Sequence, residues 1–216
     1  IYLELFLINC LLSLMQKYLK VLFHIFKNYH FYSIPILFSE TLFYLKHKNI
    51  VNKFKYLNDD FLSDSIPCPY YFLKKIKKFT VQKNIKHLCD LGSGYGKVLY
   101  FFGDLNNYQI DGVELNEEVY LDSTILSNDN IKIFNENILE FNLNNKKYDL
   151  FIMNDPLKKN EDLLELILKI KKFCKKSYLI FINLDKKKIE SANCNLKLID
   201  SFIVSKNRNI LFYSVI

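Results

Sequence analysis

Three of the five glycines in this 216-residue chain stand close together, beside residues that can bind a ligand. They are Gly92, Gly94 and Gly96, with Ser93 between them and Asp90 just before them. Glycine permits positive φ and lets a ligand touch the backbone. An apolar run typical of a short strand precedes this loop, and a helical pattern follows it. A strand, a glycine-rich turn and a helix N-terminus together predict the nucleotide-binding corner of an α/β sheet.

The glycine spacing and a distant carboxylate indicate which nucleotide this corner would bind. The dinucleotide fingerprint needs its third glycine one place later, where Lys97 stands. A pyrophosphate must approach the helix N-terminus closely, whereas S-adenosylmethionine (SAM) has no phosphate to place there. Glu114 ends the next predicted strand, and its two oxygens can accept hydrogen bonds from both ribose hydroxyls of an adenosine. The combination favours SAM. Tyr95 is expected to be a loop residue and Lys97 a helix-surface residue.

With these residues, the chain from about residue 66 to residue 216 resembles the class I, Rossmann-like SAM-dependent methyltransferases. The stretch 90–96 is similar to their first motif, so the resemblance implies that Asp90 and the loop backbone hold the methionine part of SAM. Glu114 resembles their ribose ligand. The stretch 135–141 resembles the third-strand motif whose acid faces the adenine amino group, although Asn137 stands where the family usually has Asp. The implied cofactor-binding residues are Asp90, Gly92, Ser93, Gly94, Gly96, Glu114, Asn137, Ile138 and Asn154.

The predicted fourth strand ends in Asn154, Asp155, Pro156 and Leu157. This stretch is similar to the (Asp/Asn)-Pro-Pro-(Tyr/Phe) motif of amino-methylating members, which grips the substrate nitrogen with an amide and carbonyls. Here Asp155 replaces the first Pro, and Leu157 replaces the aromatic ring. Without that ring, methylation of a flat base or of a glutamine amide is disfavoured.

The glycine loop followed by residues 112–114 is also similar to two lysine-methylating groups, the nucleosomal disruptor-of-silencing type and the mitochondrial enzymes that modify the ATP-synthase c subunit. The resemblance implies methyl transfer to a protein lysine, with residues 66–70 as a strap over the cofactor. Asn154, Asp155 and Tyr70 are the predicted catalytic residues, because Asp155 or Tyr70 could take or hold the lysine proton. Asp155 could equally be a turn residue before the following proline. Methylation of RNA, methylation of a small molecule, and SAM binding without turnover at a membrane stay open.

Apolar runs alternate with helical patterns from about residue 66 onward, which predicts a parallel sheet. The last two runs predict an antiparallel hairpin. With the resemblance, this implies an α/β fold with a Rossmann-like, mostly parallel seven-stranded sheet and an antiparallel C-terminal hairpin. The methyltransferase domain is expected at residues 61–216, after a helical N-terminal segment at 1–60. The predicted strands are 86–90, 109–114, 131–134, 148–153, 177–183, 196–204 and 210–215, and the predicted helices are 70–79, 97–105, one ending near 126, and 160–173.

Residues 1–60 are aromatic and aliphatic and contain no glycine. Polar residues within 9–27 recur at three- and four-residue steps, which predicts one polar stripe on an otherwise apolar helix. The longest uncharged runs, 5–16 and 28–39, are shorter than the roughly 20 residues of a membrane span. We expect this helix to pack on the catalytic domain; the alternative is contact with a membrane surface through residues 1–45. Because the chain begins with Ile1 rather than Met, residues could be missing before it.

The formal charge of +7 is carried almost wholly by lysine, since Arg208 is the single arginine among 30 basic residues. Recognition of bases and phosphates favours arginine, so a generic basic surface explains the charge, and a protein acceptor is preferred to RNA. The five cysteines are scattered without a C-x-x-C pair, which favours a reducing cytosol over a zinc site or a disulfide framework. No metal is expected, the location is expected to be cytoplasmic or membrane-associated, and the oligomeric state is left open.

Overall fold

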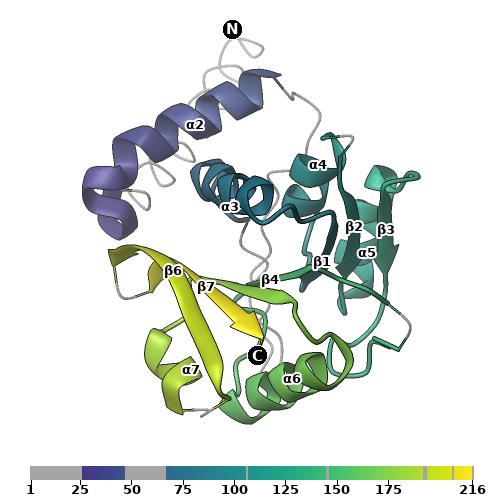
Figure 1. The fold of residues 1–216 in the computed structure, drawn as a ribbon. Coiled ribbons are helices and arrows are strands. Elements are labelled where there is room, and N and C mark those ends of the chain that lie inside the picture. The colour runs from purple at the N-terminus through teal and green to yellow at the C-terminus, as the bar shows by residue number, and fades with distance from the viewer. Residues whose placement is uncertain are drawn as a thin grey trace, which may run out of the picture.

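Figure 1 shows the computed structural model of the chain, which describes residues 26–46, 67–105, 107–144, 146–191, 194–205 and 207–215. The polar stripe predicted within 9–27 lies outside this part of the chain except for Lys27, which is exposed. Residue 66 of the predicted strap and Cys10 also lie outside it. Within the described ranges, every helix falls short of the length and hydropathy that crossing a bilayer would require.

A seven-stranded sheet forms the centre of the molecule, in the order β3-β2-β1-β4-β5-β7-β6. Strands β1 to β5 pair in parallel, and β7 runs antiparallel to both β5 and β6. The strand order reverses between β1 and β4, and open α/β sheets bind ligands beyond the carboxyl ends of the strands at such a point. The strands are β1 His87–Leu91, β2 Gln109–Val113, β3 Ile131–Phe134, β4 Leu150–Asn154, β5 Tyr178–Ile182, β6 Leu196–Ser205 and β7 Arg208–Val215.

Helices cover both faces of this sheet (Figure 1). Side chains alternate along each strand, so in β1 Leu88 faces the core shared with α3 and α4, whereas Cys89 faces the core shared with α6 and α7. Leu73, Ile76 and Phe79 recur on one side of α3 and are buried there. The helices, including two short 3-10 turns, are η1 His30–Tyr32, α2 Ser33–Lys46, α3 Tyr70–Gln82, α4 Lys97–Gly103, α5 Glu117–Ser123, η2 Thr124–Leu126, α6 Asn160–Phe173 and α7 Lys186–Ser191.

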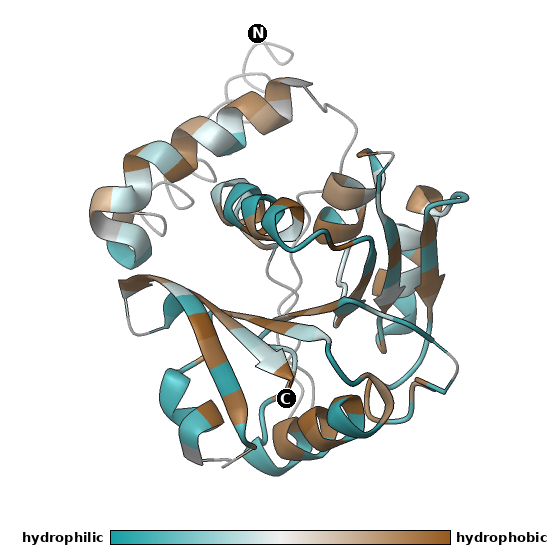
Figure 2. Cartoon of the chain, viewed as in Figure 1, coloured by the Kyte–Doolittle hydropathy of each residue, from teal (hydrophilic) through white to brown (hydrophobic). Residues whose placement is uncertain are grey.

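The described part of the N-terminal segment packs on the domain, because α2 lies against α3 (Figure 1). Pro35 falls in the first turn of α2, where a missing N–H breaks no hydrogen bond. Ile36 and Phe43 are 1% and 3% exposed, and the Phe43 ring lies 4.4 Å from the Tyr70 ring at the start of α3. The outer side of α2 is also apolar (Figure 2), so this helix presents hydrophobic residues in two directions.

The predicted fold class is confirmed: the sheet has seven strands, is mostly parallel and ends in an antiparallel hairpin. The helix α7 was not predicted, because Lys186 and the two lysines after it are typical of a solvated stretch; buried Ile189 anchors it. The four cysteines in the described residues are buried and form no disulfide bond. In the same residues, no group of three or more His, Cys, Asp or Glu is arranged to hold a metal ion.

Candidate functional site

The loop between β1 and α4 owes its shape to its glycines. The φ angles of Gly92, Gly94 and Gly96 are +81°, +54° and +81°, a conformation that other residue types rarely adopt. The backbone N–H groups of Gly92 and of the next residue donate to the carbonyl of Val113 at 2.9 and 3.0 Å, which fastens the loop to β2. A Cβ added at Gly92 would lie 2.7 Å from the Cβ of Pro156. The glycine loop therefore touches both the end of β2 and the segment that follows β4.

Two buried polar atoms beside this loop have no hydrogen-bond partner among the residues that the structure describes. They are Oδ2 of Asp90 and Oγ of Ser93, in side chains that are 2% and 7% exposed. Burial, and then the carboxylate of Glu114, raise the pKa of Asp90 well above its ordinary value. Because buried polar groups are nearly always hydrogen-bonded, an unpaired acceptor and hydroxyl beside a glycine loop indicate a ligand site. Two neighbouring carboxylates favour a ligand that carries positive charge.

Glu114 follows β2 and reaches the glycine loop. Its Oε2 accepts the backbone N–H of Gly94, and its Oε1 accepts the backbone N–H of Asn116, each at 2.8 Å. Burial raises the pKa of Glu114, and these backbone hydrogen bonds oppose the shift. A carboxylate has about four lone-pair positions, so each fixed oxygen can accept a further hydrogen bond. The residue predicted to bind ribose is thus held in place with acceptor capacity to spare.

The loop after β3 contains the residues predicted to face adenine. Oδ1 of Asn137 accepts the backbone N–H of Leu139 at 3.0 Å, so the amide shapes a local turn, and Ile138 is 8% exposed. Asn135, which was not predicted, joins this loop to the ribose side: its Nδ2 donates to the carbonyls of Glu114 and of the following residue at 2.9 and 3.1 Å. No pattern in the sequence singled it out, because an asparagine after a strand is common.

The residues that were predicted to bind the methyl acceptor lie at the carboxyl end of β4, beside the glycine loop. Oδ1 of Asn154 accepts a hydrogen bond from Nδ2 of Asn183 at 2.9 Å, which fixes the orientation of the Asn154 amide. Asn183 follows β5 and has φ of +60°, a conformation that Asn tolerates better than most residues. Asn183 was not predicted, because an asparagine after a strand has no distinctive pattern.

Asp155 combines a turn conformation with an altered carboxyl group. Its φ is +44°, so the turn interpretation of this residue describes its backbone well. Its Oδ1 lies 3.9 Å from Nζ of Lys188 on α7. Burial raises the pKa of Asp155, and Lys188 and Arg208 oppose the shift. A carboxyl group with a raised pKa takes up a proton more readily than an ordinary one, so the turn conformation and a chemical role are compatible.

Tyr70 is placed differently from the other predicted catalytic residues. Its ring packs between Phe43 of α2 and Phe101 of α4, with centroid distances of 4.4 and 5.2 Å. Burial and the charge of Asp104 raise its pKa, and Asp104 follows the C-terminus of α4, whereas the glycine loop precedes its N-terminus. These contacts assign the ring to packing, and a catalytic role for Tyr70 stays a prediction.

Tyr95 lies in the loop as expected, but the expected helix-surface position of Lys97 is wrong. These residues are 9% and 5% exposed. The ammonium of Lys97 is covered by the carboxylate of Glu40 from α2, with a distance of 2.7 Å from Nζ to Oε2. A helix from the N-terminal segment therefore contacts the residue that directly follows the glycine loop. The sequence pattern of the loop alone could not reveal this contact.

No protein-family model matches the chain, and no curated protein matches its sequence. Solved structures do match the fold. Magnesium protoporphyrin IX methyltransferase ChlM from Synechocystis PCC 6803 with bound SAM has a TM-score of 0.55 at 14% identity, over 67% of this chain and 78% of that one. The N-methyltransferase NodS from Bradyrhizobium japonicum WM9 with S-adenosylhomocysteine (SAH) has a TM-score of 0.56 at 9% identity, over 67% and 86%. The methyltransferase domain of bacterial CtHen1 has 0.56 at 12%, over 67% and 97%. The chain therefore has the fold of class I SAM-dependent methyltransferases.

Proposed function

We propose that this chain is a SAM-dependent methyltransferase. The observation that carries the proposal is the buried, unpaired Oδ2 of Asp90 beside a loop of three positive-φ glycines, with the carboxylate of Glu114 next to it. SAM carries positive charge on its sulfonium and on its α-ammonium, and two carboxylates would neutralise that charge. Its ribose hydroxyls match the acceptor capacity of Glu114. Solved structures of the same fold that contain SAM or SAH support the proposal.

Different residues of the site would hold different parts of SAM. Asp90 and Ser93 would hold the methionine part, Glu114 would hold the ribose, and Asn137 with Ile138 would border the adenine. When bound, SAM supplies an electrophilic methyl carbon on a sulfonium. The chain then needs chiefly to hold an acceptor in line with that carbon and to keep water away, because a correctly oriented displacement gains most of its rate from position.

We further propose that the acceptor is the amine of a protein lysine. Asn154, fixed by Asn183, would orient the acceptor nitrogen, and the Asp155 carboxylate would attract its ammonium. Asp155 would take one proton from that ammonium, which would free the nitrogen lone pair for the methyl carbon that bound SAM supplies, with SAH as the leaving product. Leu157 packs against the core and supplies no ring for stacking a base. The carboxylates would also repel RNA phosphates, so RNA is the less favoured acceptor.

Calorimetry with SAM and with SAH tests the cofactor, and a protein that binds neither is not a methyltransferase. Transfer of a labelled methyl group into a cell extract, followed by protease or nuclease digestion, tests the acceptor. We expect protease to release the label and nuclease to leave it; the reverse would refute the lysine acceptor.

On the labelled acceptor, Asp155→Asn should lower turnover while SAH affinity stays within about twofold. Asp129→Asn, on an exposed turn, is the matched control.

We also propose that the outer side of α2 contacts a lipid surface at the cytosolic side of a membrane. Phe31 of η1 and Ile34, Phe38 and Leu45 of α2 recur at helical spacing and are 97%, 71%, 65% and 61% exposed. In a co-sedimentation assay, the wild type should pellet with phosphatidylcholine vesicles, both with and without phosphatidylserine. The double variant with Phe31→Ser and Phe38→Ser should pellet less. Ile125→Ser, which changes an 81% exposed residue on η2, is the control. If the double variant and the Ile125→Ser control pellet equally, the proposed contact between α2 and lipid is refuted.

A further inference from the structure

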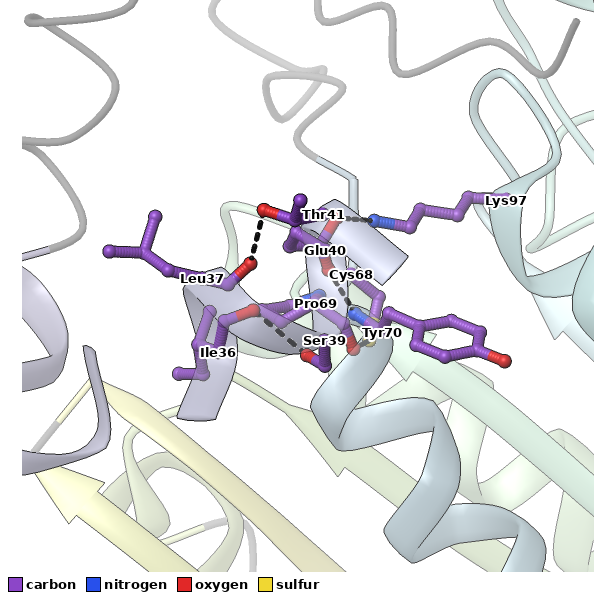
Figure 3. Close-up of polar contacts among 9 residues, drawn as sticks. All are labelled: Ile36, Leu37, Ser39, Glu40, Thr41, Cys68, Pro69, Tyr70 and Lys97. Atoms are coloured by element: carbon purple, nitrogen blue, oxygen red, sulfur yellow. Dashed lines mark hydrogen bonds and ion pairs between the residues drawn. The ribbon is translucent and has the colours of Figure 1, made fainter. Parts of the chain in front are cut away.

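One carboxylate of the N-terminal helix α2 connects two helices of the domain. Glu40 uses its two oxygens separately: Oε2 accepts from Nζ of Lys97 at 2.7 Å, and Oε1 accepts from the backbone N–H of Tyr70 (Figure 3). Lys97 is the first residue of α4, and Tyr70 is the first residue of α3. Both helix starts are therefore held by a side chain that lies 57 residues from one and 30 residues from the other in sequence.

The contact with Lys97 neutralises a charge that is largely shielded from water. The Lys97 side chain is 5% exposed and that of Glu40 is 23% exposed. The ammonium of Lys97 also lies 5.6 Å from the centre of the Phe43 ring, a second contact from α2. Removing one partner of a buried ion pair leaves an uncompensated charge, which is far more unfavourable than removing both partners. Without Glu40, the start of α4 would have to shift until Lys97 reached water.

The contact with Tyr70 replaces a missing helix cap. Helix α3 begins after Pro69, which makes no side-chain hydrogen bond to the first turn. A carboxylate near a helix N-terminus satisfies a free N–H and interacts favourably with the helix dipole. Residues 67–69, the described part of the predicted strap, lead directly into this turn. Glu40 therefore fixes the end of the strap as well as the residue that follows Gly96.

We propose that Glu40 is a positioning residue for the cofactor site, and this inference rests on the proposed function. Gly96 immediately precedes Lys97 and holds φ of +81°, so any movement of Lys97 changes the loop that would receive the methionine part of SAM. Glu40 touches neither Asp90 nor Glu114 in any hydrogen bond of the described residues. It acts through Lys97 and through the backbone of Tyr70.

Calorimetric titration of full-length variants with SAH tests the inference. Glu40→Gln and Glu40→Ala should weaken SAH binding roughly 10- to 100-fold, because Lys97 loses its counter-charge. Adding Lys97→Met to Glu40→Gln should restore most of the affinity, since no buried charge is left. Ile36→Ala is the matched control: it removes a 1% exposed side chain from the same helix and should lower the unfolding temperature while SAH affinity stays within about twofold.

Hydrogen exchange of the ligand-free protein gives an independent measurement. Glu40→Gln should speed exchange of the amides of residues 92–100, and Ile36→Ala should not. Equal loss of SAH affinity in Glu40→Ala and Ile36→Ala, or no recovery in the double variant, would overturn the positioning role while the proposed function stands. A wild type that does not bind SAH would overturn the proposed function, and unchanged exchange in Glu40→Gln would then overturn this inference separately.

Discussion

The clearest quantitative consequence of the site concerns the stability of the ligand-free protein when Asp90 is replaced by Asn. Asp90 is 2% exposed, its Oδ2 is unpaired among the described residues, and its pKa lies well above 3.8 because of burial and of Glu114. A carboxyl group with a raised pKa binds its proton more tightly in the folded than in the unfolded state. The free energy of unfolding therefore falls as pH rises from the ordinary pKa to the raised one.

The size of the effect follows from this linkage. Because Asn cannot ionise, the free energy of unfolding of Asp90→Asn does not fall in this way as pH rises. Each pH unit in the window should widen the stability difference between Asp90→Asn and wild type by up to ~1.4 kcal/mol. The difference should therefore grow as pH rises above the ordinary aspartate pKa. For a protein of this length, each 1 kcal/mol of this difference corresponds to roughly 2–4 °C in unfolding temperature.

Thermal unfolding of ligand-free protein, followed by circular dichroism at several pH values, measures the difference. Asp129→Asn, which changes an exposed aspartate in a turn, is the control for altering net charge. If Asp90→Asn unfolds at the wild-type temperature at every pH, or if the difference narrows as pH rises, the Asp90 carboxylate is not an unpaired buried charge. The main structural argument for a ligand at this position would then fail.

The same substitution should weaken the binding of SAH. A hydrogen bond to a charged group contributes about 1.5–3 kcal/mol, so replacing the carboxylate should raise the dissociation constant on the order of 10- to 100-fold. A variant that is more stable but binds less cofactor is the usual sign of a residue kept for function at the expense of stability. Calorimetry on Asp90→Asn beside Asp129→Asn separates this outcome from a general loss of fold.

Three further substitutions test other parts of the site. Gly92→Ala should abolish SAH binding in calorimetry and lower the unfolding temperature, because the new Cβ would lie 2.7 Å from Pro156 at a φ of +81°. Asn183→Gly keeps the positive φ but frees the Asn154 amide, so we expect turnover on the labelled acceptor to fall roughly tenfold with SAH affinity unchanged; an equal fall in both would contradict an acceptor-specific role. Tyr70→Phe keeps the packed ring, so turnover should stay near wild type, and a large loss would instead support the predicted catalytic hydroxyl.

Residue type alone predicted the parts of the site that depend on local backbone geometry. Gly92, Gly94 and Gly96 all adopt positive φ, which only glycine adopts readily, so their cluster indicated a loop of this shape. Apolar runs that alternate with helical patterns predicted the parallel strands, because strands buried on both faces of a sheet are apolar throughout. Glu114 was found because its position is tied to the end of a strand, and its hydrogen bond to Gly94 brings it to the predicted loop.

Contacts between distant segments were not predictable in the same way. Lys97 stands at the start of a helix, where a lysine is ordinarily solvated, and its burial depends on Glu40 from another segment. Asn135 and Asn183 act through side-chain amides that fix neighbouring loops, and asparagine after a strand is common enough to carry no signal. In each case the pairing partner decides the role, and one sequence does not reveal the partner.

Helix α2 joins two of these inferences, because its inner side carries Glu40 and its outer side carries exposed residues such as Ile34 and Phe38. If lipid contact changes how α2 rests on α3, it must also change how Glu40 holds Lys97, and the two binding equilibria are then coupled. Such coupling is reciprocal: vesicles would change the affinity for SAH by the same factor by which SAH changes the affinity for vesicles. The double variant with Glu40→Gln and Lys97→Met would remove the coupling while leaving the outer side of α2 intact. The membrane and the cofactor would therefore influence each other through one carboxylate.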